Sequence, residues 1–117
     1  MKITTRMAVR HGMVVLAIAV LHGDPAGPEG FVRRLSFPDG YQISVHWHPT
    51  GENATVLQGS LALGMGNTFD ASALHTYGVG DFAYLPPQQS HFGQAHGATI
   101  VQINGRGPFA INLGTAK

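Results

Sequence analysis

Four residues in the middle of the chain have side chains that could bind a metal ion together. His46 and His48 are two positions apart in a segment that alternates like a β-strand, so both imidazoles point to one face. Glu52 follows just past the Pro-Thr-Gly segment 49–51, where a turn can bring a carboxylate back over the strand end. His91 comes after a second strand-like segment, and a neighbouring strand of a barrel could supply it as a third imidazole.

The elements that must position these residues are short. Glycine occurs 16 times and proline 7 times, scattered between apolar segments, which is typical of an all-β protein with a turn every eight to twelve residues or so. Asp70 is expected to cap one helical turn within residues 67–73. We expect a hairpin around Gln58-Gly59, and two later strands separated by His96-Gly97. The expected strands are residues 13–21, 31–37, 41–48, 54–57, 60–65, 74–77, 82–85, 90–94, 98–104 and 109–113. This pattern favours a sandwich or barrel, and a jelly roll is the compact version.

The spacing around the first two histidines matches a known family. Five residues hold the fixed positions of the first cupin motif: Gly40, His46, His48, Glu52 and Gly59. The segment therefore resembles the cupins, a family of small β-barrels. The resemblance implies an all-β double-stranded β-helix, or jelly-roll barrel, formed by residues 1–117 as a single domain with its motifs within residues 40–95.

The second cupin motif is met in part. Gly80, Pro86 and His91 have the expected spacing, but Gln88 stands where the motif has glycine and Ala95 where it has asparagine. The first departure predicts a different turn, because a positive φ costs a glutamine about 1 kcal/mol. The second removes a structural polar group and need not affect a metal.

By this resemblance, the metal ligands would be His46, His48, Glu52 and His91. Three neutral imidazoles and one carboxylate carry one negative charge, which suits one divalent transition metal: iron, manganese, nickel, copper or zinc. Octahedral coordination would leave two cis positions open, as in a catalytic site and not a sealed structural one.

The sequence offers few other groups for acid–base chemistry. Five further carboxylates, Asp24, Glu29, Asp39, Asp70 and Asp81, all fall in predicted turns. Chemistry centred on the metal is therefore favoured. The resemblance implies a metal-dependent enzyme, foremost a dioxygenase acting on a small chelating organic molecule. A cupin isomerase or lyase, and a barrel that binds a small ligand or metal without turnover, are the alternatives, because fold does not settle the reaction.

Three amide side chains are candidates for binding the substrate. Gln42 shares the alternation of His46, so it is expected to face the barrel interior with the histidines. Gln102 and Asn104 share one face of a late strand, opposite Val101 and Ile103. These three amides could orient a small molecule. The alternative is that they hydrogen-bond across strands or face water.

Composition excludes several partners. The net charge is +1 and the seven basic residues form no stripe, which argues against nucleic acid. No apolar segment is long enough to span a membrane, and the absence of cysteine excludes thiolate and iron–sulfur sites. The expected strand 13–21 is apolar on both faces, which fits a strand covered by a partner, and predicts a homodimer.

The N-terminus allows two interpretations. Basic residues precede the apolar residues 13–21, and Ala17-Ile18-Ala19 resembles a cleavage site, so residues 1–19 could form a signal peptide. The apolar segment is also the length of a strand and ends in a turn-rich segment. We predict a strand and a cytoplasmic protein; a secreted or periplasmic location follows if residues 1–19 are a signal.

Overall fold

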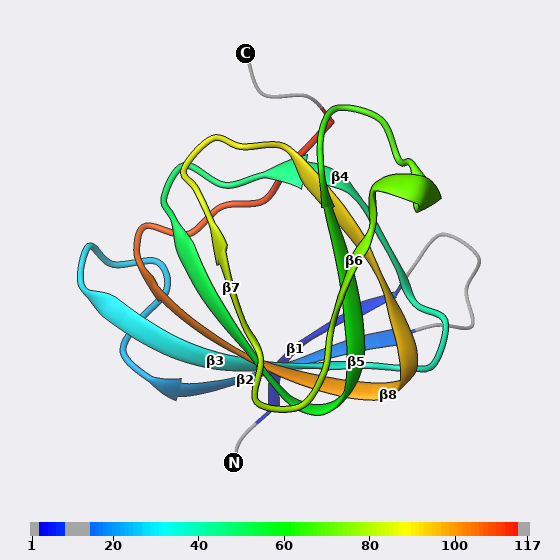
Figure 1. Ribbon diagram of the computed structural model, residues 1–117. Helices are drawn as coiled ribbons and strands as arrows, with labels where there is room; N and C mark the ends of the chain where they lie inside the picture. Colours follow the sequence, from blue (N-terminus) through cyan, green and yellow to red (C-terminus); the bar gives the residue numbers. More distant parts are fainter. Residues whose placement is uncertain (1–2, 9–14, 115–117) are drawn as a thin grey trace.

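The computed structural model describes residues 3–8 and 15–114, and this part of the chain forms nine strands and one short 3₁₀-helix, η1 (Ala71–Ala73) (Figure 1). The strands curve around one interior, and the elements follow one another with short connections. Their bounds are β1 Ile3–Ala8, β2 Val15–His22, β3 Gly30–Phe37, β4 Gln42–Trp47, β5 Glu52–Met65, β6 His75–Tyr77, β7 Phe82–Leu85, β8 His91–Arg106 and β9 Asn112–Leu113.

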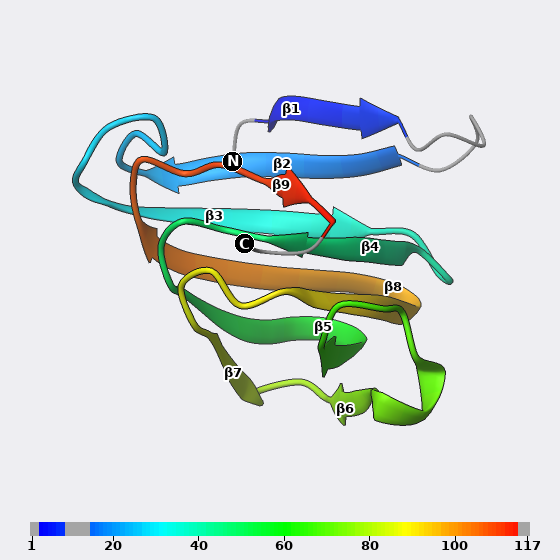
Figure 2. The same cartoon turned by 90° about the horizontal axis from the view of Figure 1, so that it is seen from above.

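Two long strands, β5 and β8, run through both walls of the barrel. They pair with each other along their whole length. On its other edge, β8 pairs with β4 near its start and with β3 near its end, while β5 pairs with β7 and then with β6. Along the sheet, neighbouring strands pair in the order β1-β2-β3-β8-β4-β9. Figure 2 shows β1, β2 and β3 side by side at one end. All these pairings are antiparallel, so the predicted all-β jelly-roll architecture is confirmed.

The predicted division of β5 into a hairpin is wrong. Residues 52–65 form one strand of 14 residues, with register shifts between Val56 and Ser60 where the strand bends from one wall to the other. Gly59 lies in this bend at φ +75°, and a Cβ there would lie 2.5 Å from the carbonyl oxygen of Ala98. The strands predicted at 90–94 and 98–104 are likewise the single strand β8, which bends opposite β5. Glycine here marks a bulge and not a turn.

Other predicted elements are confirmed. Strands β3, β4, β6 and β7 lie within one residue of the predicted bounds, while β9 covers only the last two residues of its predicted segment. Asp70 caps η1 by accepting a hydrogen bond from the Ser72 backbone N–H.

The N-terminal residues form a strand that the sequence patterns did not predict. β1 pairs with β2, and β2 pairs with β3 on its other edge. The strand predicted at 13–21 is confirmed from Val15 onward, and residues 13 and 14 lie outside the described residues. Among the residues described, no helix has the length and apolarity needed to cross a membrane.

Gln88 corrects the prediction of a different turn. It adopts φ 61°, so glutamine occupies the left-handed conformation that the motif's glycine would take. Its backbone N–H donates to the carbonyl oxygen of His48 at 2.7 Å, which ties this strained position to the backbone of a site residue.

Relief of this strain gives a testable stability change. Gln88→Gly is expected to raise the free energy of unfolding by about 1 kcal/mol, because glycine takes a positive φ without a Cβ clash. Urea denaturation measures the change. The matched control Gln94→Gly, inside strand β8, is expected to lose roughly 0.5–1 kcal/mol. A Gln88→Gly protein less stable than the parent would contradict the prediction.

Candidate metal centre

The three histidines of the candidate site come from two adjacent strands. His46 lies on β4 and pairs directly with His91, the first residue of β8. His48 follows immediately after β4, and all three side chains are buried. The period-two alternation predicted from sequence therefore places His46 and His48 on the interior face, with Trp47 turned away from them.

Each imidazole is held by a backbone carbonyl. Nδ1 of His46 lies 2.7 Å from the Ser44 oxygen, Nδ1 of His48 lies 3.0 Å from the Ala110 oxygen, and Nδ1 of His91 lies 2.9 Å from the Gln89 oxygen. A carbonyl oxygen can only accept, so Nδ1 must carry the proton and Nε2 keeps a free lone pair. This arrangement is how proteins fix the tautomer and ring orientation of metal-binding histidines.

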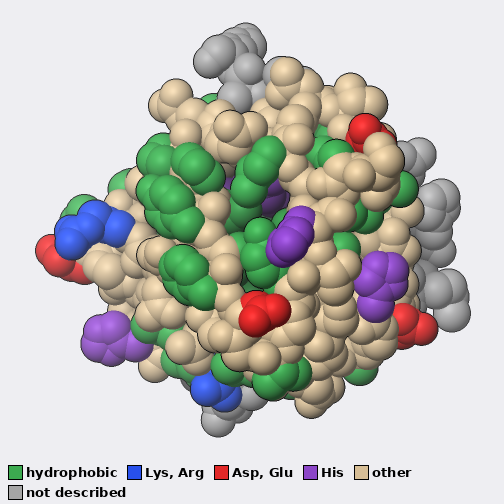
Figure 3. Space-filling view, in the orientation of Figure 1, with side chains coloured by type: hydrophobic (Ala, Val, Ile, Leu, Met, Phe, Trp, Pro, Cys, Tyr) green, Lys and Arg blue, Asp and Glu red, His purple; other side chains and the backbone are tan. Residues whose placement is uncertain are grey.

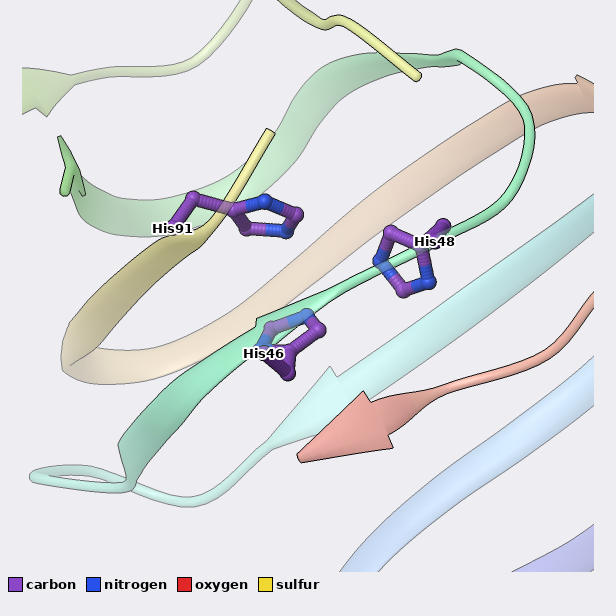
Figure 4. A group of neighbouring side chains, drawn as sticks. All are labelled: His46, His48 and His91. Atoms are coloured by element: carbon purple, nitrogen blue, oxygen red, sulfur yellow. The ribbon is translucent and has the colours of Figure 1, made fainter. Parts of the chain in front are cut away.

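The three rings converge on one point, as Figure 4 shows. Their ring centroids are 4.2–5.1 Å apart, and one nitrogen of each ring lies within 4.8 Å of the other two. These three histidines could hold a metal ion.

Glu52 lies beside this group at the start of β5. Its Oε1 is 3.3 Å from Nε2 of His48, and its side chain is buried. The turn through residues 49–51 brings the carboxylate into the same cavity as the imidazoles, as the sequence predicted. The donor set of three imidazoles and one carboxylate fits a divalent first-row ion.

Burial shifts the protonation of these groups in opposite directions. It lowers the pKa of His48 and of His91 to about 4 and also lowers the pKa of His46, so all three rings are neutral at pH 7. Burial raises the pKa of Glu52 to about 7, although the charge of Arg33 opposes the shift. At pH 6 a protonated Glu52 therefore faces the unprotonated Nε2 of His48.

These pKa values predict proton release when a metal binds. At pH 6, Zn²⁺ binding should release about one proton, because Glu52 must ionise whereas His48 and His91 are already neutral. At pH 8 release should approach zero. Calorimetry in two buffers of different ionisation enthalpy measures the number. Glu52→Gln should release none at pH 6, and release of two or more protons by the parent would contradict the prediction.

The site lies on the wall of a cavity of about 570 Å³ inside the barrel. Besides the four candidate ligands, the cavity is lined mostly by apolar side chains such as Leu35, Leu63 and Val101. Figure 3 shows a hollow ringed by hydrophobic side chains, with histidine visible within it. Such a cavity, apolar with a few convergent polar groups, is typical of a small-molecule site.

Arg33 is a residue of this cavity that the sequence predictions missed. It lies on β3 with 8% of its surface exposed, between Phe31 and Leu35 on the inward face. The alternation of residues 31–37 carried the signal, because position 33 shares its face with Phe31, Leu35 and Phe37. The adjacent Arg34 points the other way, and its Nε donates to Gln102 at 3.1 Å.

The predicted substrate-binding amides separate into two groups. Gln42 lines the cavity and is exposed, as expected of a residue at its mouth. Gln102 and Asn104 do not line it, because Val101 and Ile103 take the inward positions of β8. Asn104 instead lines a separate outer depression. These two amides therefore lie outside this cavity, and Gln102 instead accepts a hydrogen bond from Arg34 on the neighbouring strand, which is the alternative that the sequence left open.

Comparison with known proteins identifies the class of fold. No family model matches the sequence, and no curated protein matches it. Solved structures do match. An RmlC-like cupin from Shewanella frigidimarina superposes with a TM-score of 0.65 at 18% identity, over 78% of this chain and 75% of that one. The chain thus folds as a small cupin domain, which confirms the predicted resemblance at the level of fold.

Two similar structures are enzymes. A DMSP lyase from Ruegeria pomeroyi has a TM-score of 0.69 at 21% identity, over 84% of this chain and 51% of the lyase. A salicylate 1,2-dioxygenase from Pseudoaminobacter salicylatoxidans, in complex with gentisate, has a TM-score of 0.69 at 14% identity, over 84% of this chain and 29% of the dioxygenase. This chain therefore spans about half of the lyase and under a third of the dioxygenase.

Proposed function

We propose that this protein is a mononuclear metal-dependent enzyme of the dioxygenase type, acting on a small organic molecule that chelates the ion. The proposed ligands are His46, His48, Glu52 and His91. The observation that carries the proposal is the convergence of three neutral imidazoles, each with Nδ1 bonded to a backbone carbonyl and Nε2 unprotonated. Such preorganised lone pairs, on the wall of a cavity of about 570 Å³, favour an open site over a sealed one.

The distribution of acidic groups supports chemistry centred on the ion. Of the residues that line the cavity, Glu52 is the one with a carboxylate, and the five other carboxylates of the chain are exposed. A bound iron, manganese, nickel or copper ion would supply redox chemistry with dioxygen, whereas zinc would supply Lewis-acid chemistry. The chain's own residues then bind and orient the substrate and exclude water around it.

A lyase is the second candidate, supported by the similarity to the DMSP lyase. In this case the three histidines would hold the ion, and Glu52, not bound to it and with a pKa that burial raises to about 7, would exchange a proton with a bound molecule near neutral pH. A barrel that binds a ligand without turnover uses the same cavity and is the third.

One experiment separates the three candidates. Untagged protein is analysed for metal, then incubated with gentisate, salicylate, a catechol and a diketone while dissolved oxygen and products are followed. Oxygen uptake that requires His91 supports the dioxygenase. Product formation without oxygen uptake supports a lyase or isomerase, and tight retention without product supports a binding barrel. No bound metal after reconstitution with each of the five candidate ions would overturn the enzyme proposal.

We also propose a homodimer. Among the described strands, β1 lies at the end of the sheet, so a second copy could cover its outer edge and the apolar strand β2 beside it. Light scattering at micromolar concentration should give twice the mass of the chain, and a monomer would contradict the proposal.

A cytoplasmic location is proposed on separate grounds. Cleavage after Ala19 would remove β1 and more than half of β2, a strand that pairs with β3. N-terminal sequencing of protein recovered from its native cells should therefore find residues 1–19 present, and an N-terminus at Val20 would contradict this.

A further inference from the structure

Arg33 is a buried cation in the same cavity as the histidines. Its neighbours on the inward face of β3 are Phe31, Leu35 and Phe37, so the chain places a guanidinium in a row of core positions. Arginine is almost never fully buried without a partner, because desolvating the charge costs free energy. Its position on the cavity wall therefore requires an explanation.

The guanidinium forms no direct salt bridge with a described carboxylate, although the charge of Glu52 acts on it across the cavity. Nε is buried and has no hydrogen-bond partner. Among the described side chains, residues 17–114, the contact between a basic and an acidic side chain joins His48 and Glu52 and does not include Arg33. The Arg33 Cζ instead lies 4.0 Å from the ring centroid of Phe109 and 5.4 Å from that of Phe31. The faces of these aromatic rings attract the guanidinium. The ring side chains have no oxygen or nitrogen atom that could accept a hydrogen bond from it.

The charges of the cavity favour an anionic guest. A divalent ion held by neutral histidines and one ionised Glu52 has a net charge of +1, and Arg33 adds another positive charge. The remaining walls are largely aliphatic, with Leu61, Val101 and Ile103 among them. A ligand that matches this cavity combines one negatively charged group with an apolar remainder.

We propose that the cavity binds a small organic carboxylate and that Arg33 pairs with its carboxylate group. The planar guanidinium offers parallel N–H donors that match a carboxylate in bidentate geometry. This inference deepens the proposed function by naming its substrate class. It rests on that function only for a second contact, in which another oxygen of the substrate would bind the metal. The ion-pairing step requires Arg33 alone.

A carboxylate fits better than a phosphate. Of the residues lining the cavity, Arg33 is the one with a permanent positive charge, and its aromatic neighbours Phe31 and Phe109 supply no further donors from their side chains. Phosphate has a second charge and more acceptor oxygens, which one guanidinium leaves unpaired.

Calorimetry on the full chain tests the inference. The probes are three carboxylates of different shape (benzoate, salicylate and 2-oxobutanoate), the neutral benzamide, and inorganic phosphate, each titrated into protein as purified and after chelation of metal. Arg33→Met should weaken carboxylate binding by about 10- to 100-fold in both preparations. Arg34→Met, which removes the same charge from the outer face, should change it less than about twofold. Arg33→Lys keeps the charge but loses the paired, parallel N–H donors of the guanidinium. Its carboxylate affinity should lie between those of Arg33→Met and Arg34→Met.

The outcomes distinguish this inference from the proposed function. Arg33-dependent binding in protein that holds no metal supports the inference even where the enzyme proposal fails. A metal-loaded protein whose carboxylate affinity is the same in Arg33→Met and in the parent overturns it. Absence of binding by all three carboxylates, or tighter binding of phosphate or benzamide, also overturns it. If Arg33→Met does not fold, the Arg33→Lys and Arg34→Met pair decides the question.

Discussion

Replacing His91 with alanine is expected to weaken binding of a divalent metal by at least about 100-fold, because the site loses one of three imidazoles whose nitrogens lie within 4.8 Å of one another. His46→Ala should have a similar effect, since His46 and His91 face each other across strands β4 and β8. Elemental analysis of untagged protein should find about one equivalent of metal in the parent and almost none in either variant.

A second readout separates loss of metal from loss of fold. Added metal should raise the melting temperature of the parent, because a ligand that binds the native state stabilises it, but not that of His91→Ala. His96→Ala is the matched control, since His96 lies on the same strand with an exposed side chain, and it should behave as the parent does. Equal metal content in the parent, His91→Ala and His96→Ala would place the ion elsewhere.

The candidate ligands could be predicted from sequence because local rules govern them. Alternation along a strand sets the common face of His46 and His48, and the break at residues 49–51 ends the strand before Glu52. The place of His91 in the site could not be predicted from local rules, since its pairing with His46 joins positions 45 residues apart. The cupin resemblance supplied this long-range contact, and no local pattern contains it.

The long strands could not be predicted from local signals. Gly59 and Gly97 both have positive φ, and each interrupts an apolar segment as a turn would. Whether the chain reverses or bends at such a glycine depends on its partner strand, and here β5 and β8 bend against each other. The same limitation applies to Gln88, whose left-handed backbone is maintained by tertiary contacts such as its hydrogen bond to His48.

Polarity misled the sequence predictions on the cavity wall. The amides Gln102 and Asn104 were expected to face a substrate, yet the apolar residues between them face inward. The one charged residue on β3 that does face inward, Arg33, stands next to Arg34, and the pair resembles ordinary surface charge. A polar residue at an inward position of an alternating strand is therefore the stronger signal of a site than polar residues grouped on one face.

Arg33→Met is expected to raise the free energy of unfolding of the metal-free, ligand-free protein by about 1–2 kcal/mol at pH 6. Burial lowers the pKa of Arg33 more than the charge of Glu52 raises it, so its positive charge is less stable in the fold than in water. Methionine fills similar space with no charge, and this gain exceeds the lost attraction to the Phe109 ring. Urea denaturation measures the difference.

The pH dependence of that gain identifies its cause. Removing Arg33 removes the charge that opposes the rise in the pKa of Glu52, which should then exceed about 7. Above that pH, ionising Glu52 in the variant costs more, so the gain in stability should shrink between pH 6 and pH 8. Arg34→Met, on the outer face, should stay within about 0.5 kcal/mol of the parent at both values. If Arg33→Met is less stable than the parent at pH 6, the arginine stabilises the barrel itself. If Arg33→Met is more stable but binds carboxylates more weakly, the fold retains a destabilising charge at the position where its ligand binds.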